Sequence, residues 1–206
     1  EVFRPEGEVV TRCQNLSCPA QVKGRIEHFV SKGALDIDGF GEKLVDQLVD
    51  KKLILTVDDI FKLNFDDLVN LDRMAEKSAL NILTAIQDSK QTTFARFIYA
   101  LGIRNVGAHL SKVLEKAFVG DIEKFMNAAE EELEAIDEVG PIVAETIVKF
   151  WADDNNVQVV NNCFELGITL KETTNESEQI FTGKIFVFTG SLEIFTRREA
   201  KNIVIT

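Results

Sequence analysis

Residues 37–48, IDGFGEKLVDQL, carry the pattern from which the fold of this chain can be predicted. Gly39 and Gly41 flank one apolar residue, which allows a tight backbone turn, and the residues that follow carry apolar side chains at helical spacing. A turn that opens directly into a helix leaves the first N–H groups of that helix without intrahelical partners. Together with the positive end of the helix dipole, these N–H groups suit a phosphate. A plain connection between two core helices is the alternative.

The same pattern recurs three more times with a period near 33. LDRMAEKSALNI, IRNVGAHLSKVL and IDEVGPIVAETI begin at residues 71, 103 and 136. The last turn residue in the four units is Gly41, Ala75, Gly107 and Gly140. Four positions later come Val45, Ala79, Ser111 and Ala144, and seven positions later come Leu48, Ile82, Leu114 and Ile147. These offsets predict four repeated helix–turn–helix units, paired into two lobes at residues 34–90 and 94–152.

The charge of the chain is unevenly distributed. The net charge is −11, but residues 121–138 carry −7 and residues 151–180 carry −5, whereas residues 1–120 carry only −1. The first 120 residues can therefore present a basic face, and the acidic total does not exclude a nucleic-acid partner. No run of 18 apolar residues is present, so we expect no membrane partner.

Four stretches, in order along the chain, resemble one protein family. TRCQNLSCPAQ, HFVSKGALDIDGFGEK, TTFARFIYALGIRNVG and FTGKIFVFTGSL are similar to the C-terminal portion of bacterial NAD-dependent DNA ligases. The repeated units resemble helix-hairpin-helix motifs, which bind the DNA backbone through hairpin N–H groups. The resemblance covers essentially the whole chain.

The resemblance implies a mainly α fold with additions at both ends. Residues 1–23 would end a four-cysteine zinc finger, and residues 24–170 would form a helix-hairpin-helix DNA-binding domain with motifs near 37–48, 71–82, 103–114 and 136–147. Residues 171–180, KETTNESEQI, are polar and acidic, as expected of a linker. Residues 181–206 would begin a truncated α/β BRCT domain, starting with the apolar strand GKIFVFTG.

Cys13 and Cys18 are the candidate metal ligands. Two closely spaced cysteines in a chain without a disulfide framework favour a metal, but a tetrahedral zinc site needs four ligands. Cys163 and His28 fall in helical patterns and are better explained by packing. The resemblance implies that Cys13 and Cys18 are two of four Zn²⁺ ligands, with the other two upstream of Glu1, so we expect an incomplete site.

The resemblance places the candidate DNA contacts at the hairpins. They are Gly39, Gly41, Lys43, Arg73, Lys77, Arg104, Asn105, Gly107, His109 and Gly140. Arg73, Asn105 and Glu138 replace the first glycine of the motif. Asparagine tolerates positive φ, whereas arginine adopts it at a greater cost. Glu138 would repel phosphate, and Ile142 stands where the other units have Lys43, Lys77 and His109. We therefore expect the fourth unit to be mostly structural.

The family seals nicks in duplex DNA with NAD and Mg²⁺, which other domains bind, in replication and repair. Its adenylated lysine belongs to a Lys-x-Asp-Gly motif that these 206 residues lack, so we expect no catalytic residues here and no activity of this portion alone. The prediction is thus the DNA-binding part of a ligase that binds nicked double-stranded DNA, cytoplasmic, bacterial and monomeric. Two alternatives remain: another helix-hairpin-helix repair protein, such as a nuclease subunit or junction binder, and a structural scaffold without affinity for DNA.

Overall fold

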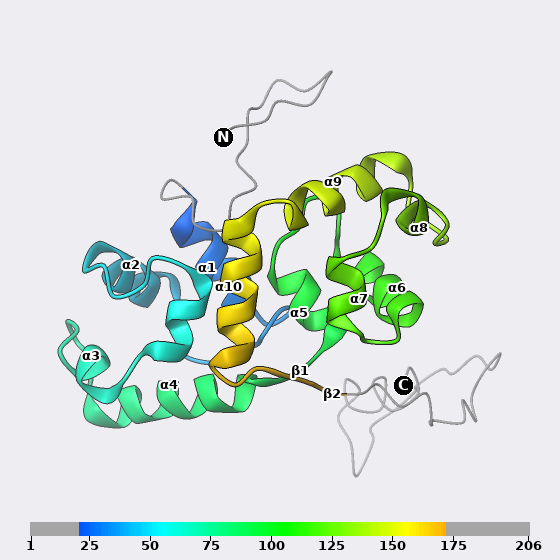
Figure 1. The fold of residues 1–206 in the computed structure, drawn as a ribbon. Helices are drawn as coiled ribbons and strands as arrows, with labels where there is room; N and C mark the ends of the chain where they lie inside the picture. Colours follow the sequence, from blue (N-terminus) through cyan, green and yellow to red (C-terminus); the bar gives the residue numbers. More distant parts are fainter. Residues whose placement is uncertain (1–20, 172–206) are drawn as a thin grey trace, which may run out of the picture. The chain divides into compact units, whose positions relative to one another are not determined.

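The computed structural model describes residues 21–171 (Figure 1). These residues are mainly helical, as predicted. In chain order the elements are α1 (Val22–Val30), α2 (Glu42–Asp50), the 3-10 helix η1 (Val57–Lys62), α3 (Phe65–Val69), α4 (Glu76–Ser89), β1 (Gln91–Thr93), α5 (Phe94–Ala100), α6 (Ala108–Phe118), α7 (Ile122–Met126), α8 (Glu130–Glu134), α9 (Pro141–Trp151), α10 (Asp154–Glu165) and β2 (Thr169–Lys171). The predicted zinc-finger cysteines, most of the linker and the BRCT segment lie outside the described residues.

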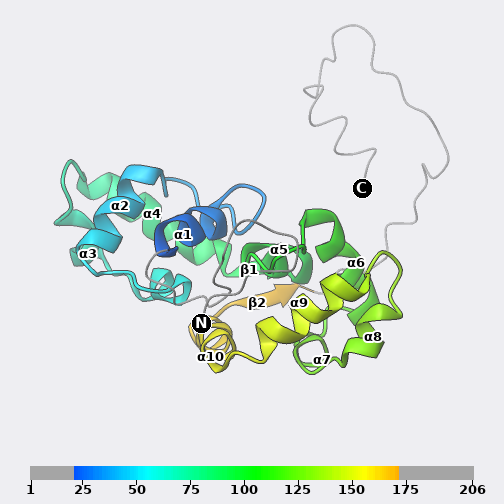
Figure 2. The same ribbon diagram turned by 90° about the horizontal axis from the view of Figure 1, so that it is seen from above.

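Four pairs of helices form the predicted hairpins. α1 packs on α2, α3 on α4, α5 on α6, and α8 on α9. In the view from above, α1 to α4 and α5 to α9 form two groups (Figure 2). We call the residues at the turn and the start of the second helix the hairpin tips: residues 39–43, 73–77, 105–109 and 138–142. Four tandem units in two lobes are therefore confirmed.

The repeated apolar offsets form the core of each hairpin. The four residues at the fourth position after the turn, Val45, Ala79, Ser111 and Ala144, are all fully buried. The four at the seventh position, Leu48, Ile82, Leu114 and Ile147, are at most 4% exposed. Small side chains at the first of these positions let the paired helices approach closely, because they leave room for the partner helix. Phe94 and Phe97 are also fully buried and belong to the core.

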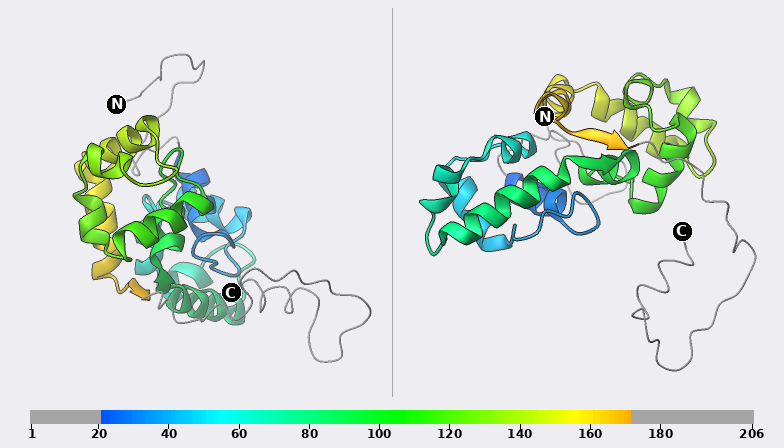
Figure 3. Two further views of the ribbon diagram at one scale, coloured as in Figure 1. Left: turned by 90° about the vertical axis from the view of Figure 1, so that its right-hand side faces the viewer. Right: turned by 90° about the horizontal axis from the view of Figure 1, so that it is seen from below.

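A two-stranded sheet joins the end of the first lobe to the end of the described chain. β1 pairs with β2 in parallel, with Gln91 opposite Thr169, and the Thr169 N–H donates to the Lys90 carbonyl at 2.8 Å. Figure 3 shows the β2 arrow running between the two groups of helices. Strands of three residues are too short to show an alternating pattern, and the sequence did not predict this pairing. Lys171, the first residue of the predicted linker, ends β2.

Polar contacts also connect the lobes. Arg96 of α5 donates from Nε to the Ala34 carbonyl at 2.8 Å, in the loop of the first hairpin. His28 of α1 places Nε2 2.7 Å from the Tyr99 carbonyl oxygen of α5. These contacts hold α1 against α5, which also pack together. His28 is thus a helix residue, as expected.

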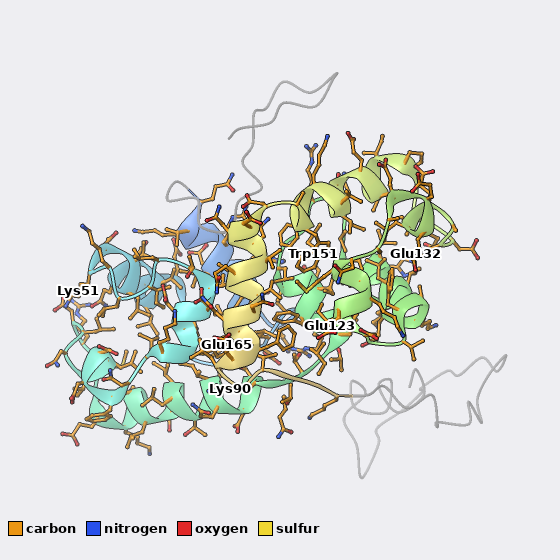
Figure 4. All side chains as sticks on the ribbon, viewed as in Figure 1. Lys51, Lys90, Glu123, Glu132, Trp151 and Glu165 are labelled. Carbon is orange, nitrogen blue, oxygen red and sulfur yellow. The ribbon has the colours of Figure 1, made fainter. Side chains whose placement is uncertain are left out.

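α10 closes the fold against both lobes. It packs on η1 and on α9 (Figure 1). Asp58 of η1 is buried, and its Oδ2 accepts from Asn162 Nδ2 at 3.0 Å and from Lys62 Nζ at 2.8 Å. At the other end of α10, Trp151, labelled in Figure 4, closes α9 with its ring centroid 5.7 Å from that of Phe125 in α7. Within residues 21–171, no helix is long and apolar enough to cross a membrane.

Candidate nucleic-acid interface

The first tip residue of every hairpin has positive φ. The angle is 82° at Gly39, 60° at Arg73, 61° at Asn105 and 69° at Glu138. Non-glycine residues pay roughly 1 kcal/mol or more for this conformation. The four turns therefore keep the same left-handed residue although only one retains glycine. The sequence indicated that Asn105 could adopt positive φ. The structure shows that Arg73 and Glu138 adopt it as well.

The third tip residue is the N-cap of the second helix, and its backbone is ordinary. φ lies between −87° and −80° at Gly41, Ala75, Gly107 and Gly140, with ψ in the extended range. Ala75 shows that a side chain is compatible with this conformation. A Cβ built at any of the three glycines meets no atom within 4 Å. Glycine here leaves the surface in front of the helix open.

The helices behind the tips also lack side-chain caps. No side chain accepts from the first N–H groups of α2, α4, α6 or α9. Asn64, Thr93, Asp121 and Asp153 cap α3, α5, α7 and α10, whereas α1 and α8, which do not begin at tips, also lack a side-chain cap. The exposed tips thus present first-turn N–H groups and the positive end of a helix dipole, which is the arrangement that binds phosphate oxygens. The fourth tip has one donor fewer, because Pro141 has no N–H.

Several exposed cations surround the first three tips. Lys43, Arg73, Lys77 and Lys112 are exposed. Among the described residues, none of these four forms an ion pair. Lys23 of α1 differs, since Asp46 and Asp50 accept from its Nζ at 2.7 and 2.9 Å, and these bonds raise the pKa of Lys23. Arg104 is half-buried and makes contacts of its own.

The third and fourth tips touch each other. His109 Nε2 lies 2.7 Å from Glu138 Oε2, and both side chains are exposed. The sequence predicted a phosphate contact for His109 and a repelling charge for Glu138, but it did not predict their pairing. The two residues are 29 positions apart and belong to different repeats, so no local signal could reveal the contact.

A different pair of contacts joins the first two hairpins. The Asp72 N–H donates to Gln47 Oε1 at 2.8 Å, and Gln47 Nε2 donates back to the Asp72 carbonyl at 3.4 Å. Gly39 lies against Ile82 of α4, because a Cβ at Gly39 would stand 3.1 Å from Ile82 Cγ1. The turn of the first hairpin therefore contacts α4, and the turn of the second hairpin contacts α2. These two contacts fix the spacing of the two tips.

The surroundings of the fourth tip are acidic and apolar. Glu130, Glu131, Glu132 and Glu134 of α8 are exposed and form an acidic face, and Glu132 is labelled at the edge of the second lobe in Figure 4. Ile142, the second residue of α9, is 72% exposed. This tip therefore differs from the other three in charge as well as in donors.

Metal binding finds no support among residues 21–171, where no group of three or more His, Cys, Asp and Glu could hold an ion. Cys13 and Cys18 lie outside the described residues. Cys163 is fully buried in α10, as expected of a packing residue, and burial raises the pKa of its thiol.

Four uncapped hairpins in tandem define the class of protein as helix-hairpin-helix. Residues 32–88 match the SAM-like helix-hairpin-helix tandem family, and residues 96–160 match the helix-hairpin-helix motif family. Residues 1–20 match the C4 zinc finger domain of NAD-dependent DNA ligases. The zinc-finger match covers both Cys13 and Cys18.

Curated relatives agree with these matches. The chain is 47% identical over 204 residues to a DNA ligase of Geotalea uraniireducens and, over the same length, 47% identical to one of Syntrophus aciditrophicus. A DNA ligase of Methylococcus capsulatus is 48% identical over 197 residues. These alignments cover 95 to 99% of the chain but only 29 to 30% of each relative. The chain is therefore similar to a segment of about 30% of the length of these DNA ligases, and its first 20 residues match a zinc finger of the NAD-dependent ones.

Proposed function

We propose that this chain is the part of an NAD-dependent DNA ligase that holds duplex DNA around a nick. The observation that carries the proposal is the shared geometry of the four hairpin tips: a left-handed turn, an open N-cap position and an uncapped helix. An uncapped helix start also occurs at α1 and α8, so the support comes from its combination with the left-handed turn and the open N-cap position, which leaves first-turn N–H groups free for phosphate. Relatives named DNA ligase favour a ligase over a nuclease subunit or junction binder.

The proposed contacts are those of the tips. First-turn N–H groups behind Gly41, Ala75 and Gly107 would donate to phosphate oxygens, with Gly39 and Asn105 shaping two of the turns. Lys43, Arg73, Lys77 and Arg104 would supply positive charge beside them, and the His109 ring would be available for a hydrogen bond to phosphate when it leaves Glu138. Such contacts carry no base information, so the affinity would be independent of sequence and sensitive to salt.

Fluorescence anisotropy with labelled duplexes, titrated with salt, tests this proposal. Each phosphate neutralised contributes roughly −0.9 to the slope of log affinity against log salt concentration. We expect a slope of several units for the 206-residue chain and similar affinities for unrelated sequences. Tighter binding to a nicked than to an intact duplex would show that this region itself senses the break. No binding at low salt would contradict the proposal.

Gly107→Val tests the open N-cap position. The valine fits the extended backbone at this position, but its side chain would stand in front of the N–H groups of α6. We expect the affinity for duplex DNA to fall by about tenfold, which corresponds to losing one charge-assisted hydrogen bond, while the melting temperature stays within a few degrees. Gly24→Val on α1 is the matched control, since a Cβ there also meets no atom within 4 Å and Gly24 is not a residue of any tip. Equal binding by both variants would show that the tip is not used.

The remaining proposals concern the whole ligase. Adenylation by NAD and nick sealing with Mg²⁺ would belong to other parts of the protein, and this chain would contribute by positioning the strand break. Cys13 and Cys18 are proposed as two Zn²⁺ ligands, which the zinc-finger match supports. We further propose that Gly140 contributes a weaker DNA contact, that the chain is a monomer and that the enzyme is cytoplasmic.

A further inference from the structure

Arg96 joins the two lobes at a place where each of them leads into a hairpin tip. Its Nε donates to the Ala34 carbonyl at 2.8 Å, and its Nη2 donates to the Lys32 carbonyl at 3.1 Å. Both acceptors lie in the loop between α1 and the first tip. Arg96 itself lies in α5, the helix that leads into the third tip. One side chain therefore connects the bases of two tips that belong to different lobes.

The chemistry of Arg96 suits it to hold the two lobes in one orientation. A guanidinium donates from a rigid plane, so two bonds made at once fix the direction of the loop as well as its distance from α5. Asp36 of the same loop places Oδ2 3.8 Å from Nη2 and adds a negative charge on that side. The guanidinium is thus held mainly by the backbone of the first lobe.

The surroundings of Arg96 make the contact between α1 and α5 a close one. His28 Nε2 lies 2.7 Å from the Tyr99 carbonyl oxygen, and the rings of these two residues meet edge to face with centroids 4.8 Å apart. A Cβ at Gly33 would stand 3.2 Å from Tyr99 Cε1, and one at Gly102 would stand 3.4 Å from His28 Cδ2. Packing this close leaves little freedom for one lobe to turn against the other.

We propose that Arg96 is a positioning residue, which holds the first and third tips in the arrangement that lets one duplex contact both. This inference rests on the proposed function, because it concerns how the tips are held and not what they bind. Two contacts on one rigid body reinforce each other, since the second forms without a further loss of freedom once the first has formed. If the lobes shift, that gain is lost although each tip stays intact. Arg96 acts through the contact between the lobes and not through DNA.

A double-mutant cycle tests this role by fluorescence anisotropy with an intact duplex. Arg96→Ala should lower the affinity of the original chain about three- to tenfold, because one of two linked contacts is misaligned. In a chain that already carries Gly107→Val, the third tip is blocked and little remains to align. Arg96→Ala should then cost no more than about twofold. A direct contact of Arg96 with phosphate would cost the same factor in both chains.

Two further variants separate the geometry of Arg96 from its charge. Arg96→Lys keeps the charge but lacks the planar fork that reaches two carbonyls, so it should bind as weakly as Arg96→Ala. Lys124→Ala is the control for the loss of one exposed cation. Lys124 pairs with Asp121 at 3.2 Å in α7, which follows the end of α6 opposite to its tip. Lys124→Ala should bind within about twofold of the original chain, because salt screens an exposed charge of this kind.

The outcomes separate this inference from the proposed function. If the original chain does not bind the duplex, both fail. If the chain binds but Arg96→Ala binds equally well, or loses the same factor with and without Gly107→Val, only the positioning role is overturned. Normal binding by Arg96→Lys would also overturn it, because charge alone would then suffice.

Two more results would contradict the positioning role. Normal binding by Gly107→Val would mean that the third tip makes no contact to align. Thermal melting of each variant checks the fold, and we expect all of them to be folded at the assay temperature. Weak binding that accompanied unfolding of both Arg96 variants would assign Arg96 to the stability of the fold instead.

Discussion

At the scale of single residues, the hairpin turns keep their shape at an energetic cost. Arg73 and Glu138 hold positive φ angles of 60° and 69°, where glycine would be relaxed. The two residues carry opposite charges at equivalent positions. Replacing each one therefore shows whether DNA binding depends on the backbone conformation of the turn or on the charge of the side chain. Both side chains are exposed, which leaves the core unaffected.

Replacing either residue with glycine should change stability little and DNA affinity in opposite directions. Relief of about 1 kcal/mol of left-handed strain is offset by the larger unfolded-state entropy of glycine. Arg73→Gly should weaken DNA binding and reduce the salt slope by about 0.9, whereas Glu138→Gly should strengthen binding at low salt. Salt-dependent anisotropy and urea unfolding measure both effects. Parallel changes in affinity would mean that only the turn geometry matters.

At the scale of elements, the distance between paired helices depends on the small residue four positions after each N-cap. Ala144 of α9 is fully buried where α9 faces α8. Ser111 occupies the equivalent place in α6, and its Oγ donates back to the Gly107 carbonyl at 3.0 Å. A hydroxyl at this position is therefore satisfied within its own helix, which explains why serine replaces alanine or valine in one unit.

Ala144→Leu should destabilise the fold by about 1–3 kcal/mol, because three additional carbons do not fit between packed helices. Urea unfolding measures the change. Ala117→Leu on the exposed face of α6 is the control, and it should shift stability by less than about 0.5 kcal/mol. Similar behaviour of the two variants would contradict close packing of α8 on α9.

At the scale of the whole described fold, α10 connects elements far apart in the chain. Asn162 bonds to Asp58 across 104 residues, and Lys62 completes the site. Hydrogen bonds to Asp58 and Asp59 raise the pKa of Lys62 above its ordinary value. A buried carboxylate needs all of these partners, because each unmet hydrogen bond costs free energy.

Asn162→Ala should therefore lower the free energy of unfolding by about 1–2 kcal/mol. Its exposed neighbour Asn161 provides the control, and Asn161→Ala should have almost no effect. Urea unfolding compares the two variants. Equal stability would show that the bond between Asn162 and Asp58 does not help to hold α10 in place.

The lowered pKa of Asp59, the neighbour of Asp58, leads us to expect that the fold loses stability in acid. Burial raises the pKa of its carboxyl, but bonds from Lys62 and from the N–H groups of Leu55 and Thr56 lower that pKa below its ordinary value overall. A carboxyl with a lowered folded-state pKa stabilises the fold above its unfolded-state value, and this contribution is lost as pH falls through the folded-state pKa. Urea midpoints measured from about pH 6 to about pH 2 should fall less steeply in Asp59→Asn than in the original chain. Identical profiles would contradict this role.

The repeat, the four hairpins and the core could all be predicted from the amino-acid sequence. Apolar offsets within one unit are local, and a helix converts them directly into a buried face, so residues such as Ala79 and Leu114 could be assigned without a structure. The candidate tips could also be located, because a turn followed by a helix start is a local pattern.

The way in which the hairpins combine became visible only in three dimensions. The contact of His109 with Glu138, the support of Asp72 by Gln47 and the closure by α10 and β2 join residues from different repeats. No periodic signal in the sequence marks such contacts, because they depend on the packing of whole elements. The left-handed turns at Arg73 and Glu138 belong here too, since the packed helices on either side impose a conformation that these residues disfavour on their own.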